Sequence, residues 1–427
     1  MMEPIAGAVH ARARSGWCCL QAGHRERYGI PRALFRAGAL DALITDLWVP
    51  PGSPQWLLAG GRTGRRMRDR YHPDLAPEKV TAFTGRALAW ELAARLRGMS
   101  MTARLQARIA WWSRLAVHAL HRKVNPATEY VFVYCYEALE LFREVRKMGL
   151  TPVLGQIDPG PVEDRKVAAI VKRWPQFRTS FRAGSEAYYA IWREECRLAG
   201  HIVVNSEWSR AALVEEGIDP GKVTVCPLVY TPPPEAMGWR RTYPDSFTKT
   251  RPLRVLFLGQ CILRKGIAET IAAAQALADR PVEFTFVGNT DIEHFEGHFG
   301  RARIRYIPRV SREECGAYYR ASDVFLFPTH SDGFGMTQLE AQAWKLPIVA
   351  SPFCAEVAVP GDYGWRLDEV SAESIAETLG RLVEDPAEVA RRSSAIGPWT
   401  FDLDQLGSRL RSLSPVSLQT SRNPPWS

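Results

Sequence analysis

Short apolar runs alternate with stretches of helical periodicity along most of the chain, a pattern typical of parallel sheets with crossover helices. In the first half, proline and glycine near the ends of residues 31–38 predict a helix, and residues 102–121 have the apolar stripe and basic face of an amphipathic helix. The pattern therefore predicts a first Rossmann-like unit, with buried strands at residues 17–20, 42–45, 130–135, 151–154 and 201–204.

A second unit of the same kind follows a segment, 231–252, that is rich in proline and polar residues and has no sustained period. Ser311 and Glu314 have the spacing of a capping box and predict a helix that runs to about residue 321. We expect an N-terminal domain over 1–230, a linker over 231–252, a C-terminal domain over 253–395, and a final helix with a disordered tail over 396–427. Strands of the second unit are predicted at residues 253–258, 282–287, 304–307, 324–327 and 348–351.

Length and composition agree with a two-domain globular protein. The chain has 427 residues, more than one core usually organises, and hydrophobic residues make up 46% and charged residues 24%. The sequence has no apolar stretch of the roughly 20 residues that a spanning helix needs, and no apolar segment of a signal peptide follows the first residues. We therefore expect a cytoplasmic protein.

The cysteines and the basic residues exclude few kinds of function. The eight cysteines are scattered without a CxxC pair, so we expect reduced, mostly buried thiols and no metal site. The formal charge is +9, with basic runs at residues 62–70 and 95–123. Such runs are usually solvated faces, but they also suit an anionic acceptor or an anionic membrane, so peripheral membrane association is a hypothesis. Nucleic acid is not expected as a partner.

Residues 331–341, SDGFGMTQLEA, hold the strongest chemical pattern in the chain. Gly333 and Gly335 allow the backbone to approach a ligand closely, and the N–H groups at the start of the next helix point towards an anion such as a diphosphate. Glu340 lies about a turn further on, where its carboxylate can accept both hydroxyls of a ribose, and Asp332 can reach a sugar hydroxyl. The alternative interpretation is a glycine turn that leads into an ordinary helix.

The spacing of Asp332 and Glu340 around Gly-Phe-Gly resembles the acid-x7-acid signature of family 4 retaining glycosyltransferases. The resemblance implies the GT-B fold, with two Rossmann-like domains that face each other across a cleft. It also implies that the first acid contacts the donor sugar, that the backbone of Gly333, Phe334 and Gly335 holds the phosphates, and that Glu340 binds the ribose. The first acid is usually Glu in this family, so Asp332 leaves the identity of the sugar open.

Residues 256–266, LFLGQCILRKG, predict a strand, a turn at Gly259 and a basic pair at a helix start. This stretch is similar to the family pattern in which an Arg and a Lys neutralise the departing diphosphate. Lys265 matches the lysine, whereas Gln260 occupies the usual position of the arginine. Arg264 is the candidate to supply the missing charge, and its alternative role is that of a solvated neighbour of Lys265.

The resemblance is specific over about residues 200–385. It includes Ser206, which is placed to cap a helix, and it departs from the family at Lys345, where a glycine usually ends the helix. The N-terminal half should hold the acceptor. There, Asp158 is the candidate acid facing the reacting sugar, with turn formation before Pro159 as its alternative.

Gly23 and the neighbouring His24 follow the first predicted strand, so they are also candidates for the ligand-binding edge of the sheet. The resemblance implies transfer of a sugar from a nucleotide-diphosphate sugar to an acceptor hydroxyl, with retention and without a metal or another cofactor. The acceptor is expected to be a saccharide, a lipid-linked molecule or a small molecule. A catalytically degenerate nucleotide-sugar-binding protein and a sugar-nucleotide epimerase remain as alternatives.

Overall fold

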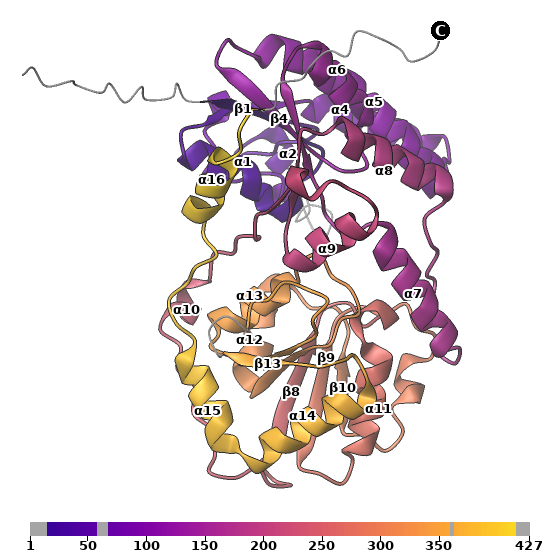
Figure 1. Cartoon of the computed structure of the whole chain (residues 1–427), viewed down its shortest axis with the longest axis vertical. Helices are drawn as coiled ribbons and strands as arrows, with labels where there is room; N and C mark the ends of the chain where they lie inside the picture. The colour runs from indigo at the N-terminus through magenta and orange to yellow at the C-terminus, as the bar shows by residue number, and fades with distance from the viewer. Residues whose placement is uncertain (1–14, 58–66, 359–362, 416–427) are drawn as a thin grey trace, which may run out of the picture. The chain divides into compact units, whose positions relative to one another are not determined.

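The computed structural model describes residues 15–57, 67–358 and 363–415, which form two compact units (Figure 1). The first unit takes its described residues from 1–155, 191–202 and 403–427, and the second takes its residues from 156–190 and 203–402. The longer helices of the described residues are α1 (Gly29–Arg36), α4 (Thr84–Leu96), α5 (Met101–Lys123), α6 (Leu139–Lys147), α7 (Pro161–Arg173), α8 (Glu186–Leu198), α9 (Glu207–Glu215), α11 (Ile267–Ala276), α12 (Arg312–Ala321), α13 (Met336–Ala343), α14 (Ala372–Glu384), α15 (Pro386–Ala395) and α16 (Leu403–Arg411). Two short helices are α2 (Pro54–Leu57) and α10 (Pro234–Met237).

Within the described residues, the N-terminal sheet has seven strands in the order β3-β2-β1-β4-β5-β6-β7. The pairs β1–β2, β1–β4, β2–β3 and β4–β5 are parallel. The predicted strands are present to within two residues at either end. Strands β3 and β7 were not predicted, because a run of three residues is too short to show an alternation of apolar and polar positions. The strands are β1 (Gly16–Gln21), β2 (Leu40–Thr45), β3 (Val80–Ala82), β4 (Thr128–Tyr134), β5 (Thr151–Gly155), β6 (His201–Val204) and β7 (Val223–Val225).

The C-terminal sheet is parallel throughout its described strands and has the order β10-β9-β8-β11-β12-β13. Its strands are β8 (Leu253–Leu258), β9 (Val282–Val287), β10 (Ile304–Ile307), β11 (Val324–Phe327), β12 (Ile348–Ala350) and β13 (Gly364–Arg366). The fold class predicted from the sequence, α/β with two Rossmann-like units, is confirmed by these two sheets.

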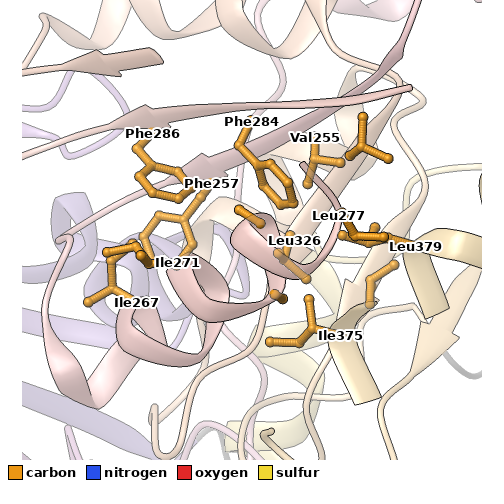
Figure 2. Close-up of a cluster of buried hydrophobic side chains, with 14 of the residues drawn as sticks. Val255, Phe257, Ile267, Ile271, Leu277, Phe284, Phe286, Leu326, Ile375 and Leu379 are labelled. Carbon is orange, nitrogen blue, oxygen red and sulfur yellow. The ribbon is translucent and has the colours of Figure 1, made fainter. Parts of the chain in front are cut away.

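Both faces of the C-terminal sheet are buried, and alternate residues of one strand serve different cores. In β8, Val255 and Phe257 join one cluster, whereas Leu256 and Leu258 join the other. The first cluster lies under α11 and α14, whose contributions include Ile271. Figure 2 shows this cluster, in which Phe257, Phe284 and Phe286 from neighbouring strands lie over Ile267, Ile271, Ile375 and Leu379. Burial on both faces explains why β11 and β12 are continuous apolar runs.

The end of the chain returns to the first unit, where α16 packs on α1 (Figure 1). A Cβ on Gly407 would lie 2.9 Å from the Ala33 carbonyl oxygen, so the small residue permits the close contact. Asp404, in the first turn of α16, is 2.6 Å from Arg36. Helix α16 lies within the range 396–427 in which a final helix was predicted. The rest of that prediction, a disordered tail, falls largely on residues 416–427, which lie outside the described residues.

The segment predicted as a linker, 231–252, lies in the second unit and is anchored there by Arg241. The Arg241 guanidinium donates hydrogen bonds to the carbonyl oxygens of Trp344 (2.8 Å), Ser322 (2.5 Å) and Tyr319. Burial lowers the pKa of Arg241. The side chain thus satisfies carbonyls at the ends of α12 and α13 that the helices leave unpaired.

Ser206 performs two tasks at the start of α9. Its hydroxyl oxygen accepts a hydrogen bond from the Ser209 amide (3.1 Å), which caps the helix as predicted, and its proton is donated to the Gly333 carbonyl (2.7 Å). A helix cap is worth about 1 kcal/mol, and a further buried hydrogen bond adds a similar amount. Ser206 therefore fixes both α9 and the loop that carries the predicted site.

We expect Ser206→Ala to lower the melting temperature more than Ser371→Ala does. Ser371 is a similarly buried serine that caps α14 through Ser374, and within the described residues its side chain has no hydrogen bond to a second segment. The expected difference is about 1 kcal/mol, or roughly 2–4 °C for a domain of this size. Differential scanning fluorimetry of both variants measures it, and equal shifts would show that the bond to Gly333 contributes nothing.

Candidate functional site

A cavity of about 190 Å³ opens at the carboxyl ends of β8 and β11 in the second unit. These two strands are neighbours at the point where the strand order reverses, which is where open α/β sheets bind ligands. Two segments far apart in the sequence line the cavity. The predicted site residues among them are Gly259, Gln260, Arg264, Lys265, Asp332 and Gly335. Met336 and Thr337, at the start of α13, also line it.

Gly266 brings the basic pair to the cavity. The residues before it form the short helix η4 (Leu263–Lys265), and Gly266 has a φ of +74°. A Cβ at this position would lie 2.0 Å from the carbonyl oxygen of Pro328, just after β11. Since only glycine tolerates both the conformation and the contact, Gly266 is required for η4 to reach the end of β11.

The glycines of the 331–341 segment are required by close backbone packing. Gly335 has a φ of +89° at the N-terminus of α13, and a Cβ there would lie 2.6 Å from the Phe327 ring. A Cβ on Gly333 would lie 2.7 Å from the Ile157 carbonyl oxygen. These contacts hold the loop so that Gly335, Met336 and Thr337, at the start of α13, line the cavity. Binding of a diphosphate by their N–H groups stays a prediction.

Lys265 and Asp332, which the resemblance assigns to the diphosphate and the sugar, are ion-paired with each other. The Lys265 Nζ donates a hydrogen bond to Asp332 Oδ2, and the Phe334 amide donates to Oδ1 at 3.3 Å. Burial lowers the pKa of Lys265 despite the attraction of Asp332. Burial acts to raise the pKa of Asp332, but the charges of Lys265 and Arg264 outweigh it, so that the pKa is lowered. A ligand that binds here must share or replace this pair.

Arg264 is not a freely solvated neighbour of Lys265. Its Nη1 donates a hydrogen bond to the Ser331 carbonyl (2.8 Å) and lies 3.4 Å from a carboxylate oxygen of Glu163 in the first turn of α7. Sequence reasoning missed Glu163, although its place at a helix start, five residues after Asp158, was a usable signal. Burial raises the pKa of Glu163 to about 7, while Arg264 and Ser331 act in the opposite direction.

Asp158 forms the turn that leads into α7. Its carboxylate accepts a hydrogen bond from the Gly160 amide (2.9 Å), and its backbone carbonyl accepts one from Gln156 (2.9 Å). This is the turn-forming alternative that the sequence left open. The same turn still lies beside the site, because residue 157 touches Gly333 and the charge of Asp158 acts on Glu163.

Two other predicted residues lie behind the cavity lining. Glu340 Oε2 accepts a hydrogen bond from the Tyr319 hydroxyl (2.8 Å), and its other oxygen is 3.7 Å from Arg312. Burial raises the pKa of Glu340, against the effects of Tyr319 and Arg312. The Phe334 side chain is 2% exposed and packs in the core against Phe401, so only its backbone is placed for a ligand.

Gly23 belongs to the first unit, at the carboxyl end of β1. Its amide donates to Asp46 Oδ1 at 2.9 Å, and the same buried carboxylate is paired with Arg70 (3.0 Å) and Arg108 (2.5 Å). Arg108 is thus one basic residue of the run 95–123 that serves an internal charge rather than a surface. Of the other run, residues 62–66 lie outside the described residues.

The loop after β1 contains three consecutive residues with left-handed backbone: Glu26, Arg27 and Tyr28 have φ values of 53°, 51° and 61°. Residues other than glycine rarely adopt this conformation, and each costs about 1–3 kcal/mol. Glu26 is held by the Tyr134 hydroxyl at 3.0 Å. No glycine marks this segment, so sequence reasoning had no signal for it.

In the described part of the chain, no group of three or more His, Cys, Asp and Glu side chains is arranged to hold a metal ion. The eight cysteines form no disulfide in the described residues, and seven of them are buried, as expected of mostly buried thiols. None of the described helices combines the length and hydrophobicity needed to span a bilayer.

Residues 240–397 match the family described as Glycosyl transferases group 1. The match includes every predicted residue of the cavity. Among curated proteins, D-inositol 3-phosphate glycosyltransferase of Mycolicibacterium gilvum is 27% identical over 230 residues, covering 49% of this chain and 51% of that protein. The chain spans about half, or less, of the length of such curated relatives. The match supports the resemblance to group 1 glycosyltransferases, whereas assignment to family 4 stays a prediction.

Solved structures show the same fold over nearly the whole chain. HepE from Anabaena, in complex with UDP, has a TM-score of 0.58 at 14% identity and covers 92% of this chain and 98% of that chain. Sucrose-phosphate synthase from Thermosynechococcus elongatus has a TM-score of 0.58 at 16% identity and covers 93% and 97%. At these identities the similarity shows the fold alone, which is the two-domain α/β fold predicted from the sequence.

We expect Gly335→Ala to destabilise the second unit, because the new methyl group meets Phe327 and the backbone is left-handed. The matched control is Gly380→Ala in α14, where the added methyl group meets no atom within 4 Å apart from its chain neighbours and the backbone of its own helix. Alanine favours a helix over glycine by about 0.5–1 kcal/mol, so the control should be neutral or stabilised. A Gly335→Ala protein that melts no lower than the control would contradict the tight packing of this loop.

Proposed function

We propose that this protein is a retaining glycosyltransferase that transfers a sugar from a nucleotide-diphosphate sugar to an acceptor hydroxyl without a metal ion. The observation that carries the proposal is the convergence of Arg264, Lys265 and the N-terminus of α13 on one cavity at the switch point of the C-terminal sheet. Two cations and aligned N–H groups are what a diphosphate requires when no metal neutralises it. The match of residues 240–397 to group 1 glycosyltransferases supports the same conclusion.

The ion pair of Lys265 and Asp332 gives each residue a second role once a donor binds. A diphosphate offers Lys265 more negative charge than one carboxylate does, so Lys265 moves towards the leaving group. Asp332 then has a free oxygen with which to accept a hydrogen bond from a sugar hydroxyl. In the transition state the diphosphate becomes more negative, and preorganised charges in a cavity of low dielectric stabilise it most at that point.

Glu340 is proposed to bind the ribose, with Tyr319 as the residue that orients it. The Tyr319 hydroxyl donates to one carboxylate oxygen, and the other oxygen, which lies 3.7 Å from Arg312, would accept a hydrogen bond from a ribose hydroxyl. The relatives suggest the other parts of the substrates: the HepE structure contains UDP, and the Mycolicibacterium gilvum protein is named for inositol 3-phosphate. We propose a uridine-diphosphate sugar as donor, and a saccharide, lipid-linked or small polyhydroxylated acceptor.

A degenerate binding protein and an epimerase are the alternatives. Slow release of free sugar from a nucleotide sugar in the absence of acceptor would support the transferase, because water can replace the acceptor. Binding without any turnover, with or without acceptors, would support the degenerate protein. Interconversion of two sugar epimers that stay attached to the nucleotide would support the epimerase.

We expect Lys265→Ala and Glu340→Gln to fail in different ways. Lys265 offsets charge that grows as the bond breaks, so its loss should lower kcat by about 10²-fold to 10³-fold. Glu340 binds ribose in both the ground and the transition state, so its change should weaken donor binding by about 1.5–3 kcal/mol with a smaller effect on kcat. Steady-state kinetics and donor titrations measure both.

Tyr319→Phe is the control for that pair of variants. It keeps the Glu340 carboxylate but removes its hydrogen bond, so donor binding should weaken less than in Glu340→Gln. Unchanged donor affinity in Glu340→Gln would place the nucleotide elsewhere and remove the basis of the proposed site.

We also propose that the first unit associates peripherally with anionic membrane at the cytoplasmic face. Glu91 of α4 forms an ion pair with Arg104 of α5, and the ring centroids of Trp90 and Trp111 are 6.0 Å apart, so the two helices pack side by side (Figure 1). Three apolar side chains are exposed on this hairpin: Leu92 (60%), Leu96 (80%) and Leu105 (59%). The basic residues Arg95 and Arg97 are exposed beside them. Apolar tips with flanking arginines suit the interface of an anionic bilayer.

We expect the triple change of Leu92, Leu96 and Leu105 to Ser to abolish co-sedimentation with vesicles of phosphatidylserine and phosphatidylcholine. The control is Val214→Ser with Met237→Ser, which removes exposed apolar side chains (40% and 80% exposed) from the second unit. Wild-type protein that stays in the supernatant at low salt, or a triple variant that still sediments, would count against the membrane proposal.

A further inference from the structure

Glu163 is a largely buried carboxylate next to Arg264, which lines the cavity, and the proposed reaction leaves the role of Glu163 open. It lies at the third position of α7, and its side chain is 17% exposed. The Arg264 guanidinium, 22% exposed, lies 3.4 Å from it and also donates a hydrogen bond to the Ser331 carbonyl. Ser331 is fully buried, and its hydroxyl accepts a hydrogen bond from Trp208 at 3.2 Å. Arg264 is thus held between α7 and the loop that precedes α13.

The charges in this region are nearly balanced without a ligand. Arg264 and Lys265 supply two positive charges, Asp158 and Asp332 supply two negative ones, and Glu163 adds a third negative charge as the pH rises above 7. The diphosphate of a nucleotide sugar adds two negative charges, because both phosphates are esterified and fully ionised near neutral pH. The cavity cannot hold this excess at low dielectric without a compensating change.

We propose that donor binding draws Arg264 from Glu163 to the diphosphate and that Glu163 then takes up a proton from solvent. This inference rests on the proposed function, since it assigns a regulatory part to the same site. The proton that binds to a Glu163 oxygen removes one negative charge as the donor adds two. Glu163 is therefore a positioning residue, which holds Arg264 ready in the empty site and releases it in the occupied one.

The groups that face Glu163 come from every neighbouring segment. Arg264 and Ser331 favour its ionised form, as does its place in the first turn of α7, whereas burial and the charges of Asp158 and Asp332 favour the protonated form. Lys265 is occupied by Asp332, and Lys166, one turn along α7, has its ammonium 3.6 Å from the centre of the Phe353 ring. Burial has the largest effect and raises the pKa of Glu163 to about 7, so the carboxylate can change its protonation state near neutral pH.

These groups determine how the affinity for the donor changes with pH. Loss of the Arg264 contact and the arrival of the diphosphate both raise the pKa of Glu163 further in the complex. Above pH 7 the free protein is mostly deprotonated at this site, so binding must take up a proton. Donor affinity should then fall by up to about tenfold per pH unit as the pH rises above 7, until the pKa of the complex is reached.

Calorimetric titration with UDP-glucose, or with GDP-mannose if UDP-glucose does not bind, tests this at pH 7.5. Running the titration in buffers of different ionisation enthalpy gives the number of protons taken up. The wild-type protein should take up about half a proton or more per donor. Glu163→Gln, which keeps the size and polarity of the side chain but cannot titrate, should lose most of this uptake and show a nearly flat affinity between pH 7 and 8.5.

The control is Glu195→Gln, since Glu195 is also buried with its pKa raised by burial to about 7, but it caps α6 in the first unit. Its substitution should leave the proton uptake unchanged. Binding of donor by wild-type protein with no proton uptake, or with the same uptake in Glu163→Gln, overturns the inference and leaves the proposed function standing. Failure of both nucleotide sugars to bind counts against the proposed function itself, and the inference falls with it.

Discussion

Compensation of buried charge is the constraint on which the candidate site depends. Lys265 is 13% exposed and Asp332 is 18% exposed, so neither ion keeps a full hydration shell, and each is tolerated because the other is present. The ligand-free cavity is therefore assembled as a set of mutually neutralising groups, in which Arg264 is shared between Glu163 and the Ser331 carbonyl. A charged ligand enters such a site by exchanging partners with it, so binding and rearrangement of these side chains are one event.

Backbone packing places these charges. Gly266 lets η4 touch the residue after β11, Gly335 lets α13 begin beside Phe327, and Gly333 lets the loop rest on residue 157. The Gly333 carbonyl is held in turn by hydroxyls from the start of α9, with Ser206 at 2.7 Å and Ser209 at 3.3 Å. A side chain can exchange partners reproducibly only if its Cα does not move, and the tight packing of the glycines supplies that rigidity.

The sequence revealed features that depend on local pattern and missed those that depend on contacts between distant residues. Strand β8 was predicted to the residue because five of its six positions are apolar and serve two cores, and the capping box of Ser311 and Glu314 is formed as predicted. The pairing of Glu163 with Arg264 joins residues 101 positions apart, so the position of Glu163 at a helix start could mark it as a candidate but could not identify Arg264 as its partner. For Asp158, no local pattern distinguishes an acid that faces the reacting sugar from a residue that forms the turn before Pro159. The left-handed run at Glu26 to Tyr28 is sustained by surrounding packing, which composition does not encode.

Lys345 ends α13 with a φ of +54°, where the related pattern has glycine. Its ammonium donates hydrogen bonds to the carbonyls of Ile396 (2.8 Å) and Gly397 (3.3 Å), and its own carbonyl accepts one from Ser393 (2.8 Å). A glycine would relax the backbone at this point but would have no side chain with which to reach the later segment. The hydrogen bonds of Lys345 thus restrict the conformations of residues 393–397 and join the end of α15 to α13.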